Sequence, residues 1–107
     1  MPRFVILAHD WPAPHFDLML EVGGVLKSWR LLAEPMPGVP VPAEPNDDHR
    51  LEYLDYEGPV SGGRGVVRRV DWGTFAGDVG ETWEVEWAGR GAARLARTAA
   101  GLVFVGP

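Results

Sequence analysis

Residues 9–21 read His-Asp-Trp-Pro-Ala-Pro-His-Phe-Asp-Leu-Met-Leu-Glu, and this stretch combines a regular strand pattern with a group of metal-binding side chains. Over residues 15–22, apolar side chains alternate with others; the apolar set is Phe16, Leu18, Leu20 and Val22. Such alternation is typical of a β-strand with one buried face. His15 and Asp17 therefore project together from the opposite face, which they share with Met19 and Glu21.

The polar part of this stretch has ligands for a divalent metal. His9, His15 and Asp17 are spaced H-x5-H-x-D, and imidazole and carboxylate groups bind metals such as zinc and manganese. Pro12 and Pro14 stiffen the connection between the two histidines and disfavour a helix there, as expected for a preorganised site. Taken alone, the spacing fits the polar face of a half-buried sheet better than a metal site.

The next residues predict a hairpin with a defined register. Gly23 and Gly24 are typical of a two-residue turn, and residues 25–32 form a second strand pattern. If Val22 faces Val25, then Met19 faces Ser28 and Asp17 faces Arg30. Because cross-strand partners share a face, this register predicts Arg30 on the metal-binding face.

The remainder of the chain indicates further short strands. Strand patterns occur at residues 3–8, 66–72, 82–88, 92–98 and 102–105. Residues 34–46 contain five prolines and predict an extended loop; residues 46–58 suggest an irregular segment or a short helix, and residues 61–65 a glycine turn. For each tryptophan except Trp11, which lies in the turn between the histidines, we expect a place in the core. We therefore predict a mainly β fold, a small antiparallel β-barrel or tightly curled sheet with a long Pro-rich loop and little helix.

Length, charge and composition limit the function. The 107 residues suffice for one domain, residues 1–107. The formal net charge of −5 argues against avid, non-specific binding to nucleic acid, which needs surplus Lys and Arg. Cysteine is absent, which excludes disulfides and thiolate metal sites. There is no long apolar run and no signal-peptide pattern, so we expect a cytoplasmic protein without membrane contact.

A second group of functional side chains lies at residues 47–53. It contains His49, the third histidine of the chain, and Tyr53 four residues later. A histidine and a phenol near a metal form a suitable set for phosphoryl chemistry, in which donors bind the phosphate oxygens. Residue types alone leave this reading and that of an ordinary surface loop equally open.

Three linked motifs resemble one known family. They are His9-x5-His15-Phe-Asp17-x3-Glu21, Gly24-Val-Leu-Lys-Ser-Trp29 and Asp48-His49-x3-Tyr53-x3-Glu57-Gly58. Their order and spacing resemble the 3′-phosphoesterase domain of bacterial and archaeal DNA ligase D from about residue 4 to residue 75. The resemblance implies a small β-barrel whose groove holds a manganese-type metal. It also implies an enzyme of DNA repair that trims 3′ ends, removing a terminal ribonucleoside and then a 3′-phosphate.

The resemblance assigns a role to each motif residue. It implies that His9, His15 and Asp17 bind the metal, with manganese first and zinc or cobalt as alternatives. His49 matches the histidine that contacts the scissile phosphate, and Tyr53 the tyrosine that assists it. The supporting residues are Asp47, Asp48 and Glu21.

The chain departs from the family where phosphate is bound. Met19 stands where the family has an arginine, and a thioether cannot form a charge-assisted bond to a phosphate oxygen. Leu7 and Ala33 replace a glutamine and a lysine of the family. Arg30, on the site face by the hairpin register, is our candidate for a compensating catalytic residue.

We expect a metal-dependent phosphoesterase that acts at nucleic-acid 3′ ends, with a DNA repair ligase or polymerase as a candidate partner. Two alternatives remain open at this point. One is a non-catalytic relative that binds the metal and a DNA end or a repair protein. The other is a hydrolase of a small, non-nucleic phosphate ester, which would suit the acidic net charge.

Overall fold

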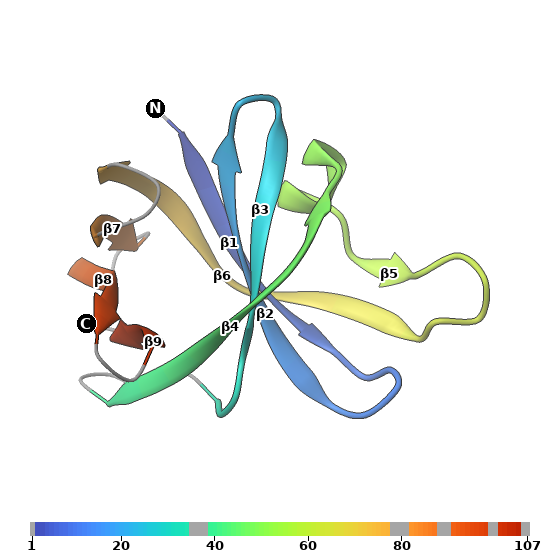
Figure 1. Cartoon of the computed structure of the whole chain (residues 1–107). Helices are drawn as coiled ribbons and strands as arrows, with labels where there is room; N and C mark the ends of the chain where they lie inside the picture. The colour runs from blue at the N-terminus through green and yellow to red at the C-terminus, as the bar shows by residue number, and fades with distance from the viewer. Residues whose placement is uncertain (1, 35–38, 78–81, 88–90, 99–100, 106–107) are drawn as a thin grey trace.

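The computed structural model describes residues 2–34, 39–77, 82–87, 91–98 and 101–105, and these residues form one antiparallel sheet (Figure 1). The only helical element among them is a short 3₁₀ turn, η1. The elements are β1 Arg3–His9, β2 His15–Val22, β3 Val25–Leu31, β4 Pro40–His49, η1 Leu51–Leu54, β5 Gly58–Pro59, β6 Val66–Gly77, β7 Thr82–Trp87, β8 Gly91–Thr98 and β9 Gly101–Val105.

The sheet is tightly curled. Its strand order is β1-β2-β3-β4-β9-β8-β7-β6-β5, and β1 additionally pairs with β6. The ladder that leaves β1 through β2 thus comes back to it through β6, with a register shift between Ile6 and Leu7. The predicted class, a mainly β chain with antiparallel strands and little helix, is confirmed.

The hairpin of β2 and β3 has the predicted register. Val22 faces Val25, and Asp17 faces Arg30. Gly23 and Gly24 have φ values of 60° and 85°, a region that glycine enters without steric cost. Asp17 and Arg30 therefore occupy neighbouring positions on one face.

Apolar side chains cover both faces of the central strands. The first cluster consists of Phe4, Ile6, Leu18, Leu20, Trp29, Leu31, Val41, Ala43 and Phe75. The second cluster lies on the opposite face and consists of Val5, Leu7, Met19, Leu26, Leu54 and Val67, with Tyr53, Tyr56 and Val60 packed against it. Alternate residues of β1 and β2 belong to the two clusters. The second cluster therefore lies on the same face of the sheet as His15 and Asp17.

The predicted Pro-rich loop is wrong over residues 40–46, which belong to β4; residues 35–38 of that loop lie outside the described part. β4 pairs with β9 over residues 40–43 and with β3 mainly over residues 43–49. The Leu32 amide donates to the Pro42 carbonyl at 3.0 Å, which fixes the side toward which residue 42 points. By strand alternation, Pro40 and Pro42 direct the side without an N–H away from β9, and Pro45 directs it away from β3, so these pairings need no donor from the prolines.

Several other elements differ in extent from the prediction. Residues 46–49 end β4 rather than forming an irregular segment, and the short helical alternative applies only to η1. β5 was not predicted, and β6 continues to Gly77. Among the tryptophans, Trp29 is buried as expected, whereas Trp72 is 43% exposed and contradicts the core prediction. The side chains of Trp83 and Trp87 lie outside the described part.

Candidate metal centre

The candidate ligands come from the ends of two adjacent strands. His9 ends β1, His15 begins β2, and the two are cross-strand partners. Asp17 lies two residues farther along β2, opposite Leu7. One ligand atom from each of the three side chains lies within 4.8 Å of the others. The antiparallel pairing thus converts the sequence spacing into a compact cluster.

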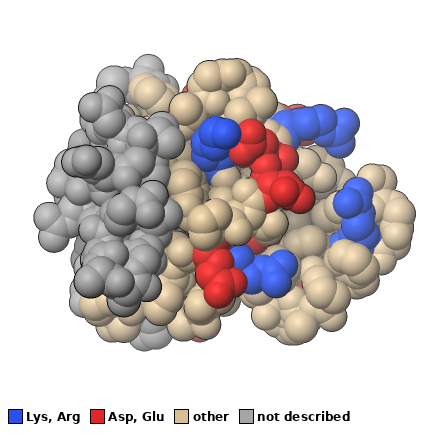
Figure 2. Space-filling model, in the orientation of Figure 1, with Lys and Arg blue, Asp and Glu red and all other residues tan. Residues whose placement is uncertain are grey.

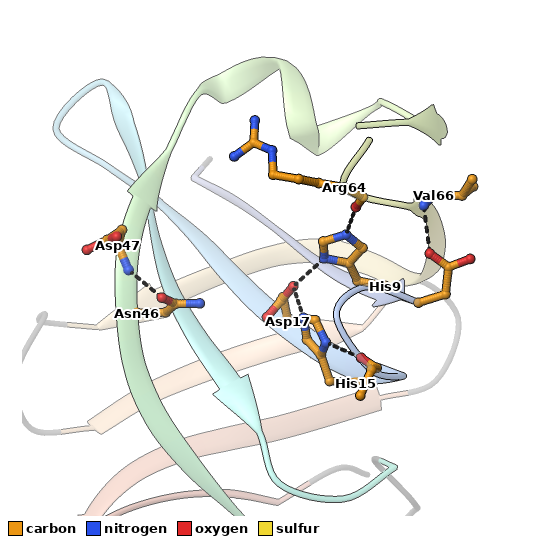
Figure 3. Close-up of polar contacts among 9 residues, drawn as sticks. His9, His15, Asp17, Asn46, Asp47, Arg64 and Val66 are labelled. Carbon is orange, nitrogen blue, oxygen red and sulfur yellow. Dashed lines mark hydrogen bonds and ion pairs between the residues drawn. The ribbon is translucent and has the colours of Figure 1, made fainter. Parts of the chain in front are cut away.

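Hydrogen bonds to main-chain carbonyls orient both imidazoles. His15 Nδ1–H donates to the Ala13 carbonyl at 2.8 Å, and His9 Nε2–H donates to the Arg64 carbonyl at 2.7 Å (Figure 3). A carbonyl cannot donate, so these bonds place the proton of each neutral ring on its outer nitrogen. The inner nitrogens then present lone pairs toward Asp17. Such carbonyl–histidine pairs are typical of metal-ligating histidines.

The convergence of these groups fits a cation. His15 Nε2 lies 3.1 Å and His9 Nδ1 3.8 Å from Asp17 Oδ2. In these tautomers both nitrogen atoms are unprotonated, so two hydrogen-bond acceptors face the carboxylate oxygen, which is also an acceptor. Asp17 is only 4% exposed, and its Oδ1 has no hydrogen-bond partner in the described residues. A divalent metal would satisfy the lone pairs and the carboxylate together.

The turn between the two histidines is held by the loop at residues 61–65. The Val66 amide donates to Asp10 Oδ1 at 2.7 Å. Gly65 has a φ of +78°, and a Cβ atom there would lie 2.2 Å from Asp10 Oδ1 and 2.5 Å from Trp11 Cβ. Only glycine permits this close approach without displacement. The loop whose Arg64 carbonyl accepts the His9 hydrogen bond therefore packs directly against the turn between the two histidines.

A second wall of the cavity is formed by the end of β4 and by η1. His49 and Tyr53 are half-buried, and their rings meet edge to face with centroids 5.7 Å apart. His49 Nδ1 is buried and has no hydrogen-bond partner among the described residues. Tyr53 packs against the second apolar cluster. The two side chains line the same cavity as His9, His15 and Asp17.

One cavity of about 630 Å³ brings most of the predicted site together. Its lining contains eight of the nine residues that the sequence singled out: His9, His15, Asp17, Arg30, Asp47, Asp48, His49 and Tyr53. Glu21, the ninth, is absent from this lining and accepts a hydrogen bond from the Arg3 amide at 3.0 Å. Asp48 also pairs with Lys27 at 3.0 Å, and the Asp47 amide donates to Asn46 Oδ1 at 2.9 Å.

Arg30 and Met19 both line this cavity. Met19 is 2% exposed and belongs to the second cluster. Arg30 is half-buried, and its Nε has no hydrogen-bond partner within the described chain. Arg30 faces Asp17 and lies diagonally across from Met19. The positively charged side chain on this face therefore comes from β3 and not from position 19 of β2.

The lining also contains residues to which the sequence analysis gave no functional role, among them one aromatic and one basic side chain. Trp11 and Arg64 also face the cavity, although residues 61–65 were read only as a turn. The sequence signal for Arg64 was its position as a single basic residue between Gly63 and Gly65. On the face drawn in Figure 2, acidic and basic side chains lie beside each other, and neither sign predominates.

A family model described as the DNA ligase D 3′-phosphoesterase domain matches residues 7–99. The chain belongs to this family. Membership connects it with the healing of DNA ends in repair. No helix in the described residues has the length and apolar character needed to cross a membrane.

Two curated relatives are similar over part of the chain. The multifunctional non-homologous end joining protein LigD of Pseudomonas aeruginosa is 38% identical over 63 residues, which are 57% of this chain and 8% of that protein. The multifunctional non-homologous end joining DNA repair protein LigD of Mycobacterium tuberculosis is 38% identical over 77 residues, 67% of this chain and 10% of that protein. The chain thus spans at most about a tenth of either relative.

Proposed function

We propose that this protein hydrolyses phosphate esters at the 3′ ends of nucleic acids. The observation that carries the proposal is the meeting of two sets of side chains in one cavity: the cluster of His9, His15 and Asp17, and the pair of His49 and Tyr53. A volume of about 630 Å³ is in the range of small-molecule sites, and suits a terminal nucleotide. Family membership supports the same reaction class.

The metal-binding residues would hold manganese, zinc or cobalt. A divalent ion bound there would polarise a phosphoryl oxygen as a Lewis acid. Asp17 supplies the negative charge of the ligand set, and the carbonyls of Ala13 and Arg64 keep the two imidazoles in the ligating tautomer.

The remaining side chains would act on the phosphate directly. Arg30 offers a non-bridging oxygen a guanidinium whose Nε has no hydrogen-bond partner among the described residues. His49 and Tyr53 can donate hydrogen bonds to the oxygens that gain charge in the transition state, and His49 can move a proton to the departing 3′ oxygen. Asp47 and Asp48 would support this wall from β4, and Glu21 would support the start of β1.

The proposal is tested with purified protein, manganese and end-labelled DNA that carries a 3′-phosphate or a 3′-terminal ribonucleotide. We expect conversion to a 3′-hydroxyl, lost in His15→Ala. The assay is repeated with zinc and with cobalt in place of manganese, and with a generic phosphomonoester in place of DNA. Turnover of the phosphomonoester alone would favour a hydrolase of small esters, which the mixed charge of Figure 2 would suit. Metal binding without turnover of any substrate would favour a non-catalytic relative that binds a DNA end or a repair ligase or polymerase.

The role of Arg30 has its own prediction. Arg30→Ala should abolish turnover and leave metal affinity nearly unchanged, because the guanidinium is not a ligand. A sharper variant adds Met19→Arg, which restores a cation about 7–8 Å away on the same face. Partial recovery of turnover in the double variant, with Met19→Leu as the volume control, would identify the missing function as phosphate binding. Unaltered turnover in Arg30→Ala would exclude a catalytic role for Arg30.

A further inference from the structure

Two tryptophans are exposed to the same extent but differ in their surroundings. Trp11 and Trp72 are each 43% exposed. The Arg69 guanidinium lies over the Trp72 ring, 4.2 Å from its centroid, so that ring already has a cationic partner. Trp11 has no ring contact of this kind in the described part of the chain, and it lines the cavity of the metal ligands. Its aromatic surface is therefore available at a functional site.

The base of the Trp11 side chain is firmly held. Its Cβ atom lies so close to Gly65 that any side chain at position 65 would collide with it. Asp10, the preceding residue, accepts the Val66 amide hydrogen bond at 2.7 Å. An exposed aromatic ring on a fixed main chain loses little conformational freedom when a ligand stacks on it. The contacts of Asp10 and Trp11 with residues 65 and 66 therefore favour a ring that can stack on a ligand.

Arg64 supplies a positive charge at the same cavity. Its Nε donates to the Ser61 carbonyl at 2.8 Å, and its Nη2 donates to Ser61 Oγ at 3.3 Å. In Figure 3 its side chain extends from the loop across the region above His9. Arg3 and Arg50 pair with carboxylates, whereas the Arg64 bonds in the described residues go to neutral groups. The guanidinium is thus oriented but not neutralised.

We propose that Trp11 and Arg64 form a nucleotide subsite at the mouth of the cavity. Trp11 stacks on the base of the 3′-terminal nucleotide, and Arg64 binds the phosphodiester that joins this nucleotide to the rest of the strand. This inference rests on the proposed function and specifies its substrate as a base-bearing strand end. Aromatic stacking tolerates every base, because each base has a π-face, so the subsite recognises an end without reading its sequence.

The test compares two 5′-labelled oligonucleotides that end in a 3′-phosphate, one with its terminal base and one abasic at that position. Binding is measured by fluorescence anisotropy in EDTA, where turnover is suppressed, and KM and kcat are measured separately with manganese. The wild-type protein should bind the base-bearing end about 5- to 150-fold more tightly, the range for one stacked base. Trp11→Ala should bring this ratio close to one, and Trp11→Phe should retain most of it.

Matched controls separate stacking from folding. Trp72→Ala removes an equally exposed tryptophan and should leave the ratio unchanged. Arg64→Ala should weaken binding to both ends by the same factor and reduce the salt dependence of binding; the His9 hydrogen bond is unaffected in principle, since its acceptor is the main-chain carbonyl. Metal-induced thermal stabilisation of each variant verifies an intact site.

The outcomes distinguish this inference from the proposed function. A wild-type ratio near one, a ratio that persists in Trp11→Ala, or no measurable binding to either end would overturn the subsite. Base-dependent binding that Trp11→Ala abolishes would support the subsite even if neither the 3′-phosphate nor the 3′-terminal ribonucleotide is hydrolysed. That result would refute the hydrolase instead. Turnover without base dependence would retain the hydrolase and reject the subsite.

Discussion

The two walls of the cavity are built in different ways. The wall from β1 and β2 consists of His9, His15 and Asp17, whose side chains are only 15%, 10% and 6% exposed. Carbonyls fix the two imidazoles of this wall. The wall from β4 and η1 carries His49 and Tyr53, which meet edge to face, while ion pairs on exposed side chains join its flanks to the rest of the sheet.

We infer that the first wall is suited to bind a metal ion and the second wall to position a phosphate. Polar groups that are buried, oriented and short of partners are suited to hold a cation, which requires fixed ligand geometry. A wall held by ring packing and exposed ion pairs can adjust when a phosphate enters, because exposed pairs contribute little rigidity. We therefore expect substitutions in the first wall to act on metal affinity, and substitutions in the second wall to act on turnover.

The largest effect is expected for Asp17→Asn. The substitution keeps the shape of the side chain but removes the anionic ligand, so manganese affinity should fall by more than about 100-fold, the upper end of the loss expected for supporting residues alone. Isothermal titration calorimetry measures this directly. In EDTA, the variant should be at least as stable as the wild type, because a buried carboxylate with an unpartnered oxygen is costly. A marked loss of stability without metal would show that Asp17 has a structural role.

The next effect tests the second wall. His49→Ala should reduce kcat by about 100- to 10,000-fold, as expected for a group that donates to the reacting phosphate, and should change manganese affinity by less than about twofold. Tyr53→Phe keeps the ring that contacts His49 and removes only the hydroxyl, so it should also lower kcat while leaving manganese affinity unchanged. A parallel loss of metal affinity in His49→Ala would contradict the division between the walls.

An intermediate effect is expected for Gly65→Ala, which disturbs the loop seated on the first wall. The added Cβ would meet Asp10 and Trp11, and a loss of about 1–3 kcal/mol in unfolding free energy is typical of such a clash. Gly63→Ala is the control, because it has a similar φ of +67° and nothing within 4 Å of the added atom. Thermal melts with and without manganese should show reduced metal stabilisation only in Gly65→Ala.

The smallest effect concerns the surface contact between β1 and the residue after η1. Arg3 Nη2 lies 2.6 Å from Asp55 Oδ1, and this hydrogen bond lowers the pKa of the Asp55 carboxyl below its ordinary 3.8. A carboxyl with a depressed pKa stabilises the fold above its unfolded pKa, and this contribution is lost as the pH falls through the folded value. Asp55→Asn should thus melt slightly lower at neutral pH and coincide with the wild type in acid. Added salt should shrink the neutral-pH difference.

Much of the first wall could be predicted from the sequence. The alternation over residues 15–22 and the Gly23-Gly24 turn determine which side chains share a face, so the Asp17–Arg30 register followed before any coordinates. The cluster of His9 with His15 follows once both are placed at the ends of paired strands. These are local regularities, and local regularities are what a single sequence states best.

The rest depended on long-range contacts. The prolines of β4 resemble a loop because proline lacks an amide donor, and only the positions of β3 and β9 show that this segment pairs as a strand. The presence of His49 and Tyr53 in the same cavity as His9, His15 and Asp17 could be inferred from family resemblance but not from periodicity. The close approach of Gly65 to Asp10 and Trp11 joins this loop to the distant turn between the two histidines, and nothing local in residues 61–65 indicates it.

The use of a main-chain carbonyl at position 64 has an evolutionary consequence. Every amino acid supplies that carbonyl, so the orientation of His9 places no constraint on the side chain that position 64 carries. Mutation there can alter what enters the cavity while the metal ligands keep their supports. Gly65, one residue away, has no such freedom. A loop that combines a permissive position with a sterically restricted neighbour could change its side chain toward the cavity and still hold the turn at His9 in place.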